Sequence, residues 1–267
     1  MPVEPARKVA VVTGAAGGLG RALCRRFARD GMGVAALDRD AAGLALLARD
    51  GIPVVAIAAD ITDVEACRRA AAEVRDRLGA ADVLVNNAGI THFSTFAEAG
   101  AEVVRRVLEV NFLGAVHATE AFLPQLVARR GAIAAISSVA GFSPLYGRSG
   151  YSASKHALHG FFDTLRAELK DDGVAVTLVC PSFIATQAVI RGAGPSDGGI
   201  ARPGMAAQTA GRPLSPERVA DAVVDALRRR RRRVVIGRLA HLSYWLNAFA
   251  PAAFERAMLR RIRPEFD

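Results

Sequence analysis

Two side chains one helical turn apart, Tyr151 and Lys155, have the spacing and chemistry of an acid–base pair. A phenol titrates near 10, which is too high for an effective base at neutral pH. In a helix, the lysine four residues later projects from the same face, and its positive charge favours the phenolate. We therefore expect Lys155 to lower the pKa of Tyr151. Such a tyrosine could exchange a proton with the oxygen of a carbonyl or alcohol while hydride moves to or from its carbon.

A serine that could serve the same oxygen lies 13 residues before the tyrosine. Ser138 directly follows an apolar run, and its hydroxyl can donate a hydrogen bond to a developing oxyanion. A tyrosine-based site needs no histidine, so we interpret His92 as no more than a substrate contact. Each of these residues also has an ordinary structural explanation, as a strand-end turn or a surface pair. The serine, tyrosine and lysine in this order are more specific than any one of them.

A glycine-rich turn follows the first apolar run, with the sequence Thr-Gly-Ala-Ala-Gly-Gly-Leu-Gly over residues 13–20. Glycines let the backbone turn tightly and approach a pyrophosphate, and the next helix offers its N-terminal amides to the negative charge. The turn has the strand before it and the helix after it that a dinucleotide site requires. The predicted pyrophosphate contacts are Gly14, Gly17, Gly18, Leu19 and Gly20.

An acidic residue, Asp38, ends the second apolar run, 18 residues after Gly20. A carboxylate at this place binds the adenosine ribose hydroxyls and repels a 2′-phosphate, which favours NAD(H) over NADP(H). The alternative is that Asp38 merely caps the next helix. Arg39 could instead receive a 2′-phosphate, so NADP(H) stays open. We expect NAD(H), because residues 15–17 of the turn carry no basic side chain.

The elements that must position these residues alternate along the chain. Apolar runs of strand length cover residues 8–13, 33–37, 53–58, 81–85, 131–137, 174–180 and 233–236. They are apolar at successive positions, as in parallel strands buried on both faces. Helical periodicity covers residues 19–30, 41–50, 63–78, 101–128 and 152–172. This succession predicts an α/β doubly wound parallel sheet whose ligands bind beyond the carboxyl ends of the strands.

Local signals mark several helix ends. Thr62 is the expected N-cap of the third helix, with Glu65 at the capping-box position. Four glycines fall just past expected helix ends, where a positive φ suits them. They are Gly31, Gly51, Gly79 and Gly173.

The ordered motifs resemble the short-chain dehydrogenase/reductase family over about residues 8–236. The resemblance rests on Gly-x3-Gly-x-Gly at residues 14–20, Asn-Asn-Ala-Gly at 86–89, Ser138, Tyr-x3-Lys at 151–155 and the stretch 181–186. The sequence departs from the family pattern at Ser182, where a glycine is usual. The resemblance implies a Rossmann fold and homodimers or homotetramers formed by the helices near 101–128 and 152–172.

The resemblance also implies roles for individual residues. Lys155 would hydrogen-bond the nicotinamide ribose, and Asn111 would kink its helix and hold a water linked to Lys155. The remaining implied cofactor contacts follow successive strands. They are Asp60, Ile61, Asn87, Ala88, Gly89, Pro181, Ile184 and Thr186.

The side chains expected beside the nicotinamide are apolar: Phe142, Tyr146 and Phe183. They favour a hydrophobic secondary alcohol or ketone as substrate, although packing beneath a loop is an equal explanation. A non-catalytic NAD-binding sensor or scaffold is the rival function, but such a protein should have lost part of the Ser/Tyr/Lys set. Epimerases and dehydratases on this fold usually carry a larger C-terminal domain than 267 residues allow.

Length and composition fit one domain, residues 1–237, with a C-terminal helical extension over 238–267. Three cysteines without pairing or metal-ligand spacing suggest buried thiols, a reducing compartment and no metal site. The first residues lack the apolar core of a signal peptide, and no apolar run is long enough to span a bilayer. We therefore expect a cytoplasmic protein.

The net charge of +9 is concentrated in residues 202–267, where 14 arginines and 6 acidic residues give +8. The extension combines aliphatic and aromatic residues with arginines, and Pro251 divides it into two helical pieces. A subunit contact, a lid over the substrate entrance and a peripheral membrane contact all fit this composition. The arginine run 228–233 contains no stacking aromatic residues and borders a buried strand, so we expect no nucleic acid partner.

Overall fold

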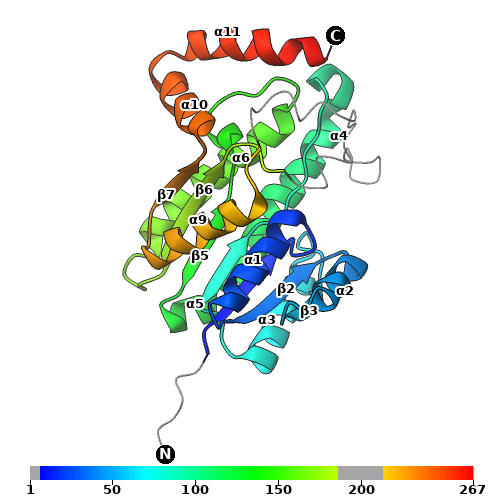
Figure 1. Ribbon diagram of the computed structural model, residues 1–267, viewed down its shortest axis with the longest axis vertical. Helices are drawn as coiled ribbons and strands as arrows, with labels where there is room; N and C mark the ends of the chain where they lie inside the picture. The colour runs from blue at the N-terminus through cyan, green and yellow to red at the C-terminus, as the bar shows by residue number, and fades with distance from the viewer. Residues whose placement is uncertain (1–6, 186–212, 267) are drawn as a thin grey trace, which may run out of the picture.

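A computed structural model describes residues 7–185 and 213–266. Its centre is a parallel sheet of seven strands in the order β3-β2-β1-β4-β5-β6-β7 (Figure 1). The strands are β1 (Val9–Thr13), β2 (Gly33–Asp38), β3 (Val55–Ala58), β4 (Val83–Asn86), β5 (Ala132–Ile136), β6 (Ala175–Pro181) and β7 (Arg233–Ile236). The order reverses between β1 and β4, so the predicted doubly wound sheet is confirmed.

Helices cover both faces of the sheet and connect its strands. They are α1 (Gly18–Arg29), α2 (Ala41–Arg49), α3 (Val64–Leu78), α4 (Phe96–Leu108), α5 (Gly114–Arg129), α6 (Ser149–Glu168), α9 (Pro216–Arg228), α10 (Arg238–Phe249) and α11 (Pro251–Ile262). A π-helical turn, η1 (Glu109–Leu113), joins α4 to α5. The single long helix expected over 101–128 is therefore interrupted. Short 3₁₀ helices cover η2 (Val139–Gly141) and η4 (Arg263–Glu265).

The strands β1, β2, β4, β5 and β6 each contribute side chains to two hydrophobic cores, because successive side chains point to opposite faces. On β1, Ala10 and Val12 pack in the core beneath α1 and α9. Val9 and Val11 pack in the other core, beneath α3, α5 and α6. Burial on both faces explains why the strands read as uninterrupted apolar runs.

The predicted N-cap of α3 is wrong by one residue. The carboxylate of Asp63 accepts the N–H groups of Glu65 and Ala66, at 2.8 and 3.1 Å. The hydroxyl of Thr62 instead donates to Asp60 at 2.8 Å, which removes it from the helix end. The helix-end glycines have the predicted positive φ at Gly31, Gly51, Gly79 and Gly173.

The strands are parallel, so their carboxyl ends lie along one edge of the sheet. The chain leaves β7 at this edge and enters α10 and then α11, which form the orange and red end of the molecule in Figure 1. Pro251 begins α11, as expected for a residue that divides the extension. Within residues 7–185 and 213–266, no helix has the length and apolarity needed to cross a bilayer.

Candidate active site

The glycine-rich turn between β1 and α1 is packed too tightly for side chains. Gly14 has a φ of 64°, and a Cβ there would lie 2.7 Å from the Cα of Ala88. A Cβ on Gly20 would lie 2.1 Å from the carbonyl oxygen of Gly14. The N-cap of α1 is Gly17, which supplies no side-chain hydrogen bond to the first helical turn. Those amides are therefore available to an anion.

Hydrogen bonds from the segment after β4 hold the glycine-rich turn in its position. The side-chain amide of Asn87 donates to the carbonyl oxygens of Thr13 and Gly14, at 2.9 and 3.1 Å. The hydroxyl of Thr13 accepts the N–H groups of Asn87 and Ala88, at 3.0 and 3.1 Å. These bonds join the two segments that the sequence assigned to the dinucleotide.

Asp38 lies beside the same turn, at the carboxyl end of β2. One carboxylate oxygen accepts the N–H of Ala16 at 3.0 Å, and the other accepts the N–H of Asp40 at 3.0 Å. Asp40, not Asp38, caps α2, through its bond to the N–H of Gly43. The capping alternative for Asp38 therefore does not hold. Arg39 follows as an exposed residue.

The segment after β3 contributes a carboxylate and a buried aliphatic residue. Burial raises the pKa of Asp60, but hydrogen bonds from Thr62 and the charges of Arg39 and Arg106 outweigh it, so the pKa is lowered. Ile61 is buried, 7% exposed, beneath α5. The structure places both at the edge where the strands end, outside the lining of the cavity described next.

A cavity of about 550 Å³ lies at the carboxyl ends of the strands. It brings together predicted residues from several separate segments. They are Leu19, Asn87, Gly89, Ser138, Tyr151, Lys155, Pro181, Phe183 and Ile184. Thr186 lies outside the described residues.

Tyr151 projects from the first turn of α6, and Ser138 lies between β5 and η2. The Ser138 hydroxyl accepts the N–H of Ala140 at 3.2 Å, which fixes its position. Burial raises the pKa of Tyr151, and the hydrogen bond from Ser138 and the charge of Arg148 oppose this effect without reversing it. The expectation that the pKa of Tyr151 is lowered was therefore wrong.

The surroundings of Lys155 show that this residue is buried close to Tyr151. Its ammonium group is buried, lies 5.5 Å from the ring centroid of Tyr151 and donates to the carbonyl oxygen of Ile136 at 2.8 Å. Burial lowers the pKa of Lys155 to about 8. A low dielectric penalises the charged form of both groups, so burial raises the pKa of the phenol and lowers that of the amine.

Asn111 lies in the π-helical turn η1, where the resemblance implied a kink. Its side-chain oxygen accepts the N–H of Ile90 at 2.7 Å, and its amide donates to the carbonyl of Ile90 and to the hydroxyl of Ser154, at 2.9 and 3.0 Å. The side chain thus ties the segment after β4 to α6. The water assigned to Asn111 stays a prediction.

His92 has a role that the sequence interpretation missed. The imidazole is fully buried, and its Nε2 accepts the N–H groups of Gly150 and Tyr151, at 3.1 and 3.3 Å. Its Nδ1 lies 3.1 Å from the hydroxyl of Ser94. Burial and the charge of Arg148 lower the pKa of His92, which favours the neutral acceptor. Since α6 has no side-chain cap of its own, His92 caps it.

Two of the predicted substrate contacts lie outside the cavity lining. The ring of Phe142 packs 5.0 Å from that of Tyr244 on α10, and its carbonyl accepts the amide of Asn247 at 2.8 Å. The ring of Tyr146 packs 5.2 Å from that of Phe266. Both aromatic residues follow the strand end as expected, but the C-terminal extension covers them. They anchor that extension instead of facing a substrate.

The extension itself forms part of the cavity wall, which fits the lid alternative. The lining residues that it supplies are Leu239, Leu242, Ser243, Leu246, Phe254, Ala257, Met258, Arg261 and Ile262. Thr91 also lines the cavity, and its buried hydroxyl has no hydrogen-bond partner among the described residues. It is a candidate substrate contact that no pattern in the sequence indicates.

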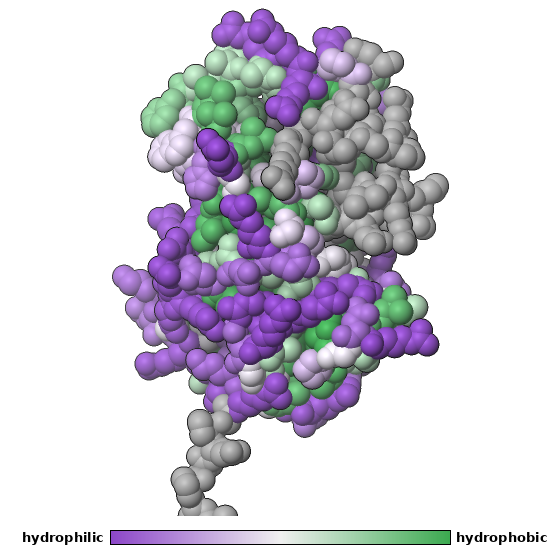
Figure 2. Space-filling model, in the orientation of Figure 1, coloured by the Kyte–Doolittle hydropathy of each residue, from purple (hydrophilic) through white to green (hydrophobic). Residues whose placement is uncertain are grey.

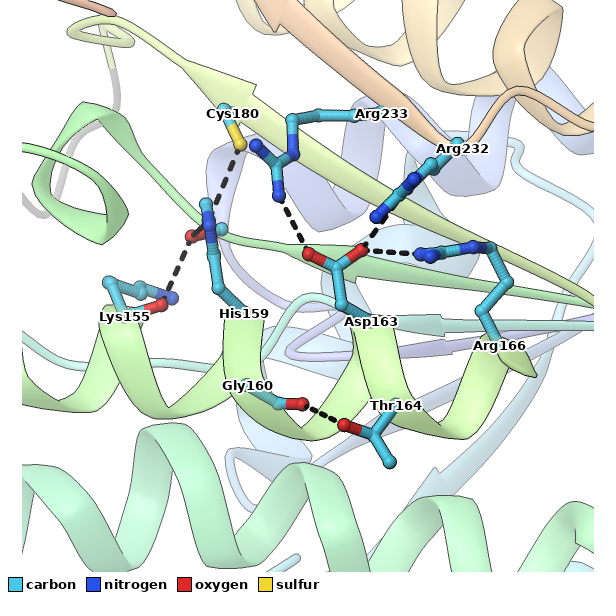
Figure 3. A network of polar contacts seen from close by, with 10 residues as sticks. Lys155, His159, Gly160, Asp163, Thr164, Arg166, Cys180, Arg232 and Arg233 are labelled. Carbon is cyan, nitrogen blue, oxygen red and sulfur yellow. Dashed lines mark hydrogen bonds and ion pairs between the residues drawn. The ribbon is translucent and has the colours of Figure 1, made fainter. Parts of the chain in front are cut away.

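The arginine run makes contacts within the chain. Figure 3 shows Asp163 of α6 facing Arg166, Arg232 and Arg233, with 2.7 Å between Arg233 and the carboxylate. Earlier in the run, Arg228, Arg229 and Arg230 bind Asp30, Asp225 and the carbonyl oxygens of Arg130 and Gly173. These contacts fix the start of β7 against α6.

Comparison with known proteins agrees with this geometry. A family model described as short chain dehydrogenase matches residues 8–192. Dehydrogenase/reductase SDR family member 7B of Bos taurus is 35% identical over 269 residues, covering 96% of this chain and 82% of that protein.

Solved structures give the same result. A short-chain dehydrogenase from Streptomyces avermitilis superimposes with a TM-score of 0.78 and 30% identity, covering 98% of this chain and 99% of that one. A short-chain dehydrogenase/reductase from Burkholderia phymatum in complex with NAD has a TM-score of 0.82 and 27% identity, covering 94% and 96%. The chain belongs to the short-chain dehydrogenase/reductase family.

Proposed function

We propose that this protein is an oxidoreductase that transfers hydride between NAD(H) and a hydrophobic secondary alcohol or ketone. One observation carries the proposal. Ser138, Tyr151 and Lys155 line the same cavity as Leu19 and Gly89. Leu19 belongs to the glycine-rich turn, and Gly89 belongs to the segment after β4 that packs against this turn. A proton-transfer group and a dinucleotide cradle thus face one space.

The residues present fit a nicotinamide dinucleotide. The tight turn, the α1 amides without a side-chain cap and the carboxylate of Asp38 match pyrophosphate and ribose in turn. The residues that would hold the cofactor are Gly14, Gly17, Gly18, Leu19, Gly20, Asp38, Asp60, Asn87, Ala88, Gly89, Tyr151, Lys155, Pro181 and Ile184. Bound there, NAD(H) would supply or accept the hydride. Asp38 supports a preference for NAD(H) because its charge repels a 2′-phosphate.

Residues of the chain itself would transfer the proton and bind the substrate oxygen. Ser138 would donate to that oxygen, and Tyr151 would give or take the proton. Lys155 would place a positive charge one helical turn from the phenol, and Asn111 would hold α6 against the segment after β4. The pKa of Tyr151 is raised by burial, which suits a proton donor.

The substrate side supports an apolar molecule. Phe183, Leu246 and Phe254 line the cavity, while Ser138 and Thr91 supply hydroxyl groups. This combination suits one carbonyl or hydroxyl group on a hydrophobic body better than a sugar. By its family resemblance, we further propose that the chain acts as a homodimer or homotetramer.

The test is turnover of hydrophobic secondary alcohols and ketones with NAD(H) and NADP(H), for the wild type and Tyr151→Phe. The variant keeps the ring and loses the proton, so kcat should fall by roughly 10²–10⁴-fold while NADH binding persists. Near-full activity of Tyr151→Phe on a confirmed substrate would remove Tyr151 from the chemistry. NADH binding without turnover of any substrate would instead favour a sensor or scaffold.

A further inference from the structure

The outward side of α10 is apolar. Leu242, Trp245 and Phe249 are 61%, 56% and 79% exposed, and together they form what we call the α10 face. Their spacing of three and four residues places them on one side of the helix. The rings of Trp245 and Phe249 stack with centroids 5.7 Å apart. Figure 2 shows hydrophobic residues gathered over this upper part of the molecule.

This apolar face is bordered by positive charge. Residues 238–262 contain four arginines, Arg238, Arg256, Arg260 and Arg261, and one acidic residue, Glu255. All four arginines are exposed, and none pairs with a carboxylate among the described residues. Elsewhere, exposed arginines of this chain do form such pairs, as Arg229 does with Asp225. Among the residues whose side chains the structure describes, the extension therefore presents these four cations without carboxylate partners.

The mouth of the cavity lies between the α10 face and the exposed arginines of α11. Leu242 of the α10 face both lines the cavity and is exposed, and so do Ala257 and Arg261 of α11. The inner sides of the same helices are buried, with Phe254 and Ile262 at 9% and 5% exposure. A ligand entering at this rim would pass directly from the α10 face into an apolar cavity.

We propose that α10 and α11 dock on an anionic lipid surface, with the mouth of the cavity turned towards the lipid. Stacked aromatic residues are stable at the boundary between headgroups and acyl chains, and arginines are drawn to anionic headgroups. The inference that the cavity takes its hydrophobic ligand from the lipid rests on the proposed function. The docking itself does not.

A second copy of the chain fits this surface less well than lipid. A two-fold contact is made by the same patch on both subunits, so it would bring two patches of the same positive charge together. Among the described side chains of the patch, Glu255 is the one carboxylate against four arginines, so that repulsion would have little compensation. An anionic surface satisfies the arginines and covers the aromatic residues together.

The experiment uses the full chain and vesicles of phosphatidylglycerol mixed with phosphatidylcholine. Trp245 is the single tryptophan, so its emission should shift to the blue when vesicles are added, and salt should weaken the effect. Phosphatidylcholine vesicles alone should give little response. Leu242→Ser/Phe249→Ser removes apolar side chains from the interface, and Arg256→Glu/Arg260→Glu reverses two charges. Each variant should weaken co-sedimentation with anionic vesicles by roughly tenfold or more.

Leu46→Ser and Arg69→Glu are matched controls, because these residues are exposed on α2 and α3, and both variants should bind vesicles as the wild type does. The proposal is overturned if the wild type neither sediments with anionic vesicles nor shifts its emission. It is also overturned if Leu242→Ser/Phe249→Ser dissociates an oligomer in light scattering without affecting lipid binding, which would make the face a subunit contact. Vesicle binding is measured without cofactor or substrate, so its failure is distinct from failure of the proposed reaction.

Discussion

The Nε2 atom of His92 accepts a hydrogen bond of 3.3 Å from the backbone N–H of Tyr151, 59 residues later in the chain. The same atom accepts the N–H of Gly150 at 3.1 Å. A side chain from the segment after β4 therefore caps α6, the helix that carries both Tyr151 and Lys155. The position of the proposed proton donor depends on a residue that does not itself line the cavity.

Replacing His92 by leucine should destabilise the protein and reduce its activity. Leucine fills the space but leaves two buried N–H groups without an acceptor, at a cost of about 1–3 kcal/mol for each. The free energy of unfolding in urea and kcat on a confirmed substrate measure the two effects. His92→Gln, which can accept one of the bonds, should recover part of both.

His156→Leu is the control, because His156 is exposed on the same helix and bonds only the carbonyl of Ser152 among the described residues. It should change neither quantity appreciably. If His92→Leu unfolded at the same urea concentration as the wild type, the cap would contribute nothing and our account of α6 would be incorrect.

Cofactor preference should depend on the charge of Asp38. We expect a higher kcat/KM with NAD(H) than with NADP(H) in the wild type, because the carboxylate repels a 2′-phosphate. Asp38→Asn removes the charge and keeps an oxygen that can accept the N–H of Ala16, so the glycine-rich turn should keep its conformation. The ratio of kcat/KM with NAD(H) to that with NADP(H) should therefore decrease. Asp40→Asn is the neighbouring control, since Asp40 caps α2. A wild-type preference for NADP(H) would contradict this interpretation.

The strands and most of the site could be predicted because their signals are local. Burial on both faces makes each strand apolar throughout, and parallel strands place whatever follows them at one edge. Asp38 and Ser138 were found by this rule, and Tyr151 was found by its spacing from Lys155. The N-cap of α3 was missed because Asp60 competes for Thr62, a contact that depends on side-chain geometry.

Other features depend on contacts between distant segments and leave no local pattern. His92 caps a helix 58 residues away, and the extension covers Phe142 and Tyr146 more than 100 residues after them in the chain. The raised pKa of Tyr151 has the same origin. Spacing alone predicted stabilisation by Lys155, whereas burial, which is a property of the whole fold, decides the direction.

The free energy of unfolding should decrease in acid because the folded protein holds His159 in its neutral form. Burial, and then the charge of Arg233, lower the pKa of His159 to about 4, while Asp163 opposes them (Figure 3). The ring nitrogen Nε2 lies 2.9 Å from the hydroxyl of Ser137 and 3.6 Å from the thiol of Cys180. Between pH 6.5 and 4 the unfolded chain binds a proton that the folded chain excludes, so stability decreases as pH falls through this range.

The free energy of unfolding of the wild type and His159→Gln, measured at pH 7 and pH 5, tests this effect. Glutamine can accept the bond from Ser137 without titrating, so the loss of stability between the two pH values should be smaller in the variant. His241→Gln should keep the wild-type difference, because His241 is exposed on α10 and is not among the groups that shift the pKa of His159. An equal loss in the wild type and His159→Gln would show that another group is responsible.

The C-terminal extension should affect the substrate and not the cofactor. A chain ending at Gly237 keeps every residue to which we assign the cofactor or the proton, so it should bind NADH as the full chain does. It loses the cavity wall formed by Leu246, Phe254 and Ile262, so KM for apolar substrates should rise by roughly tenfold or more, as expected when apolar contact is replaced by water.

Truncation also uncovers Phe142, which should destabilise the shortened chain. Phe254→Ala in the full chain avoids this difficulty and should raise KM with little change in kcat. Loss of NADH binding in a folded truncated chain would show that residues 238–267 belong to the nucleotide-binding domain and are not an accessory to it.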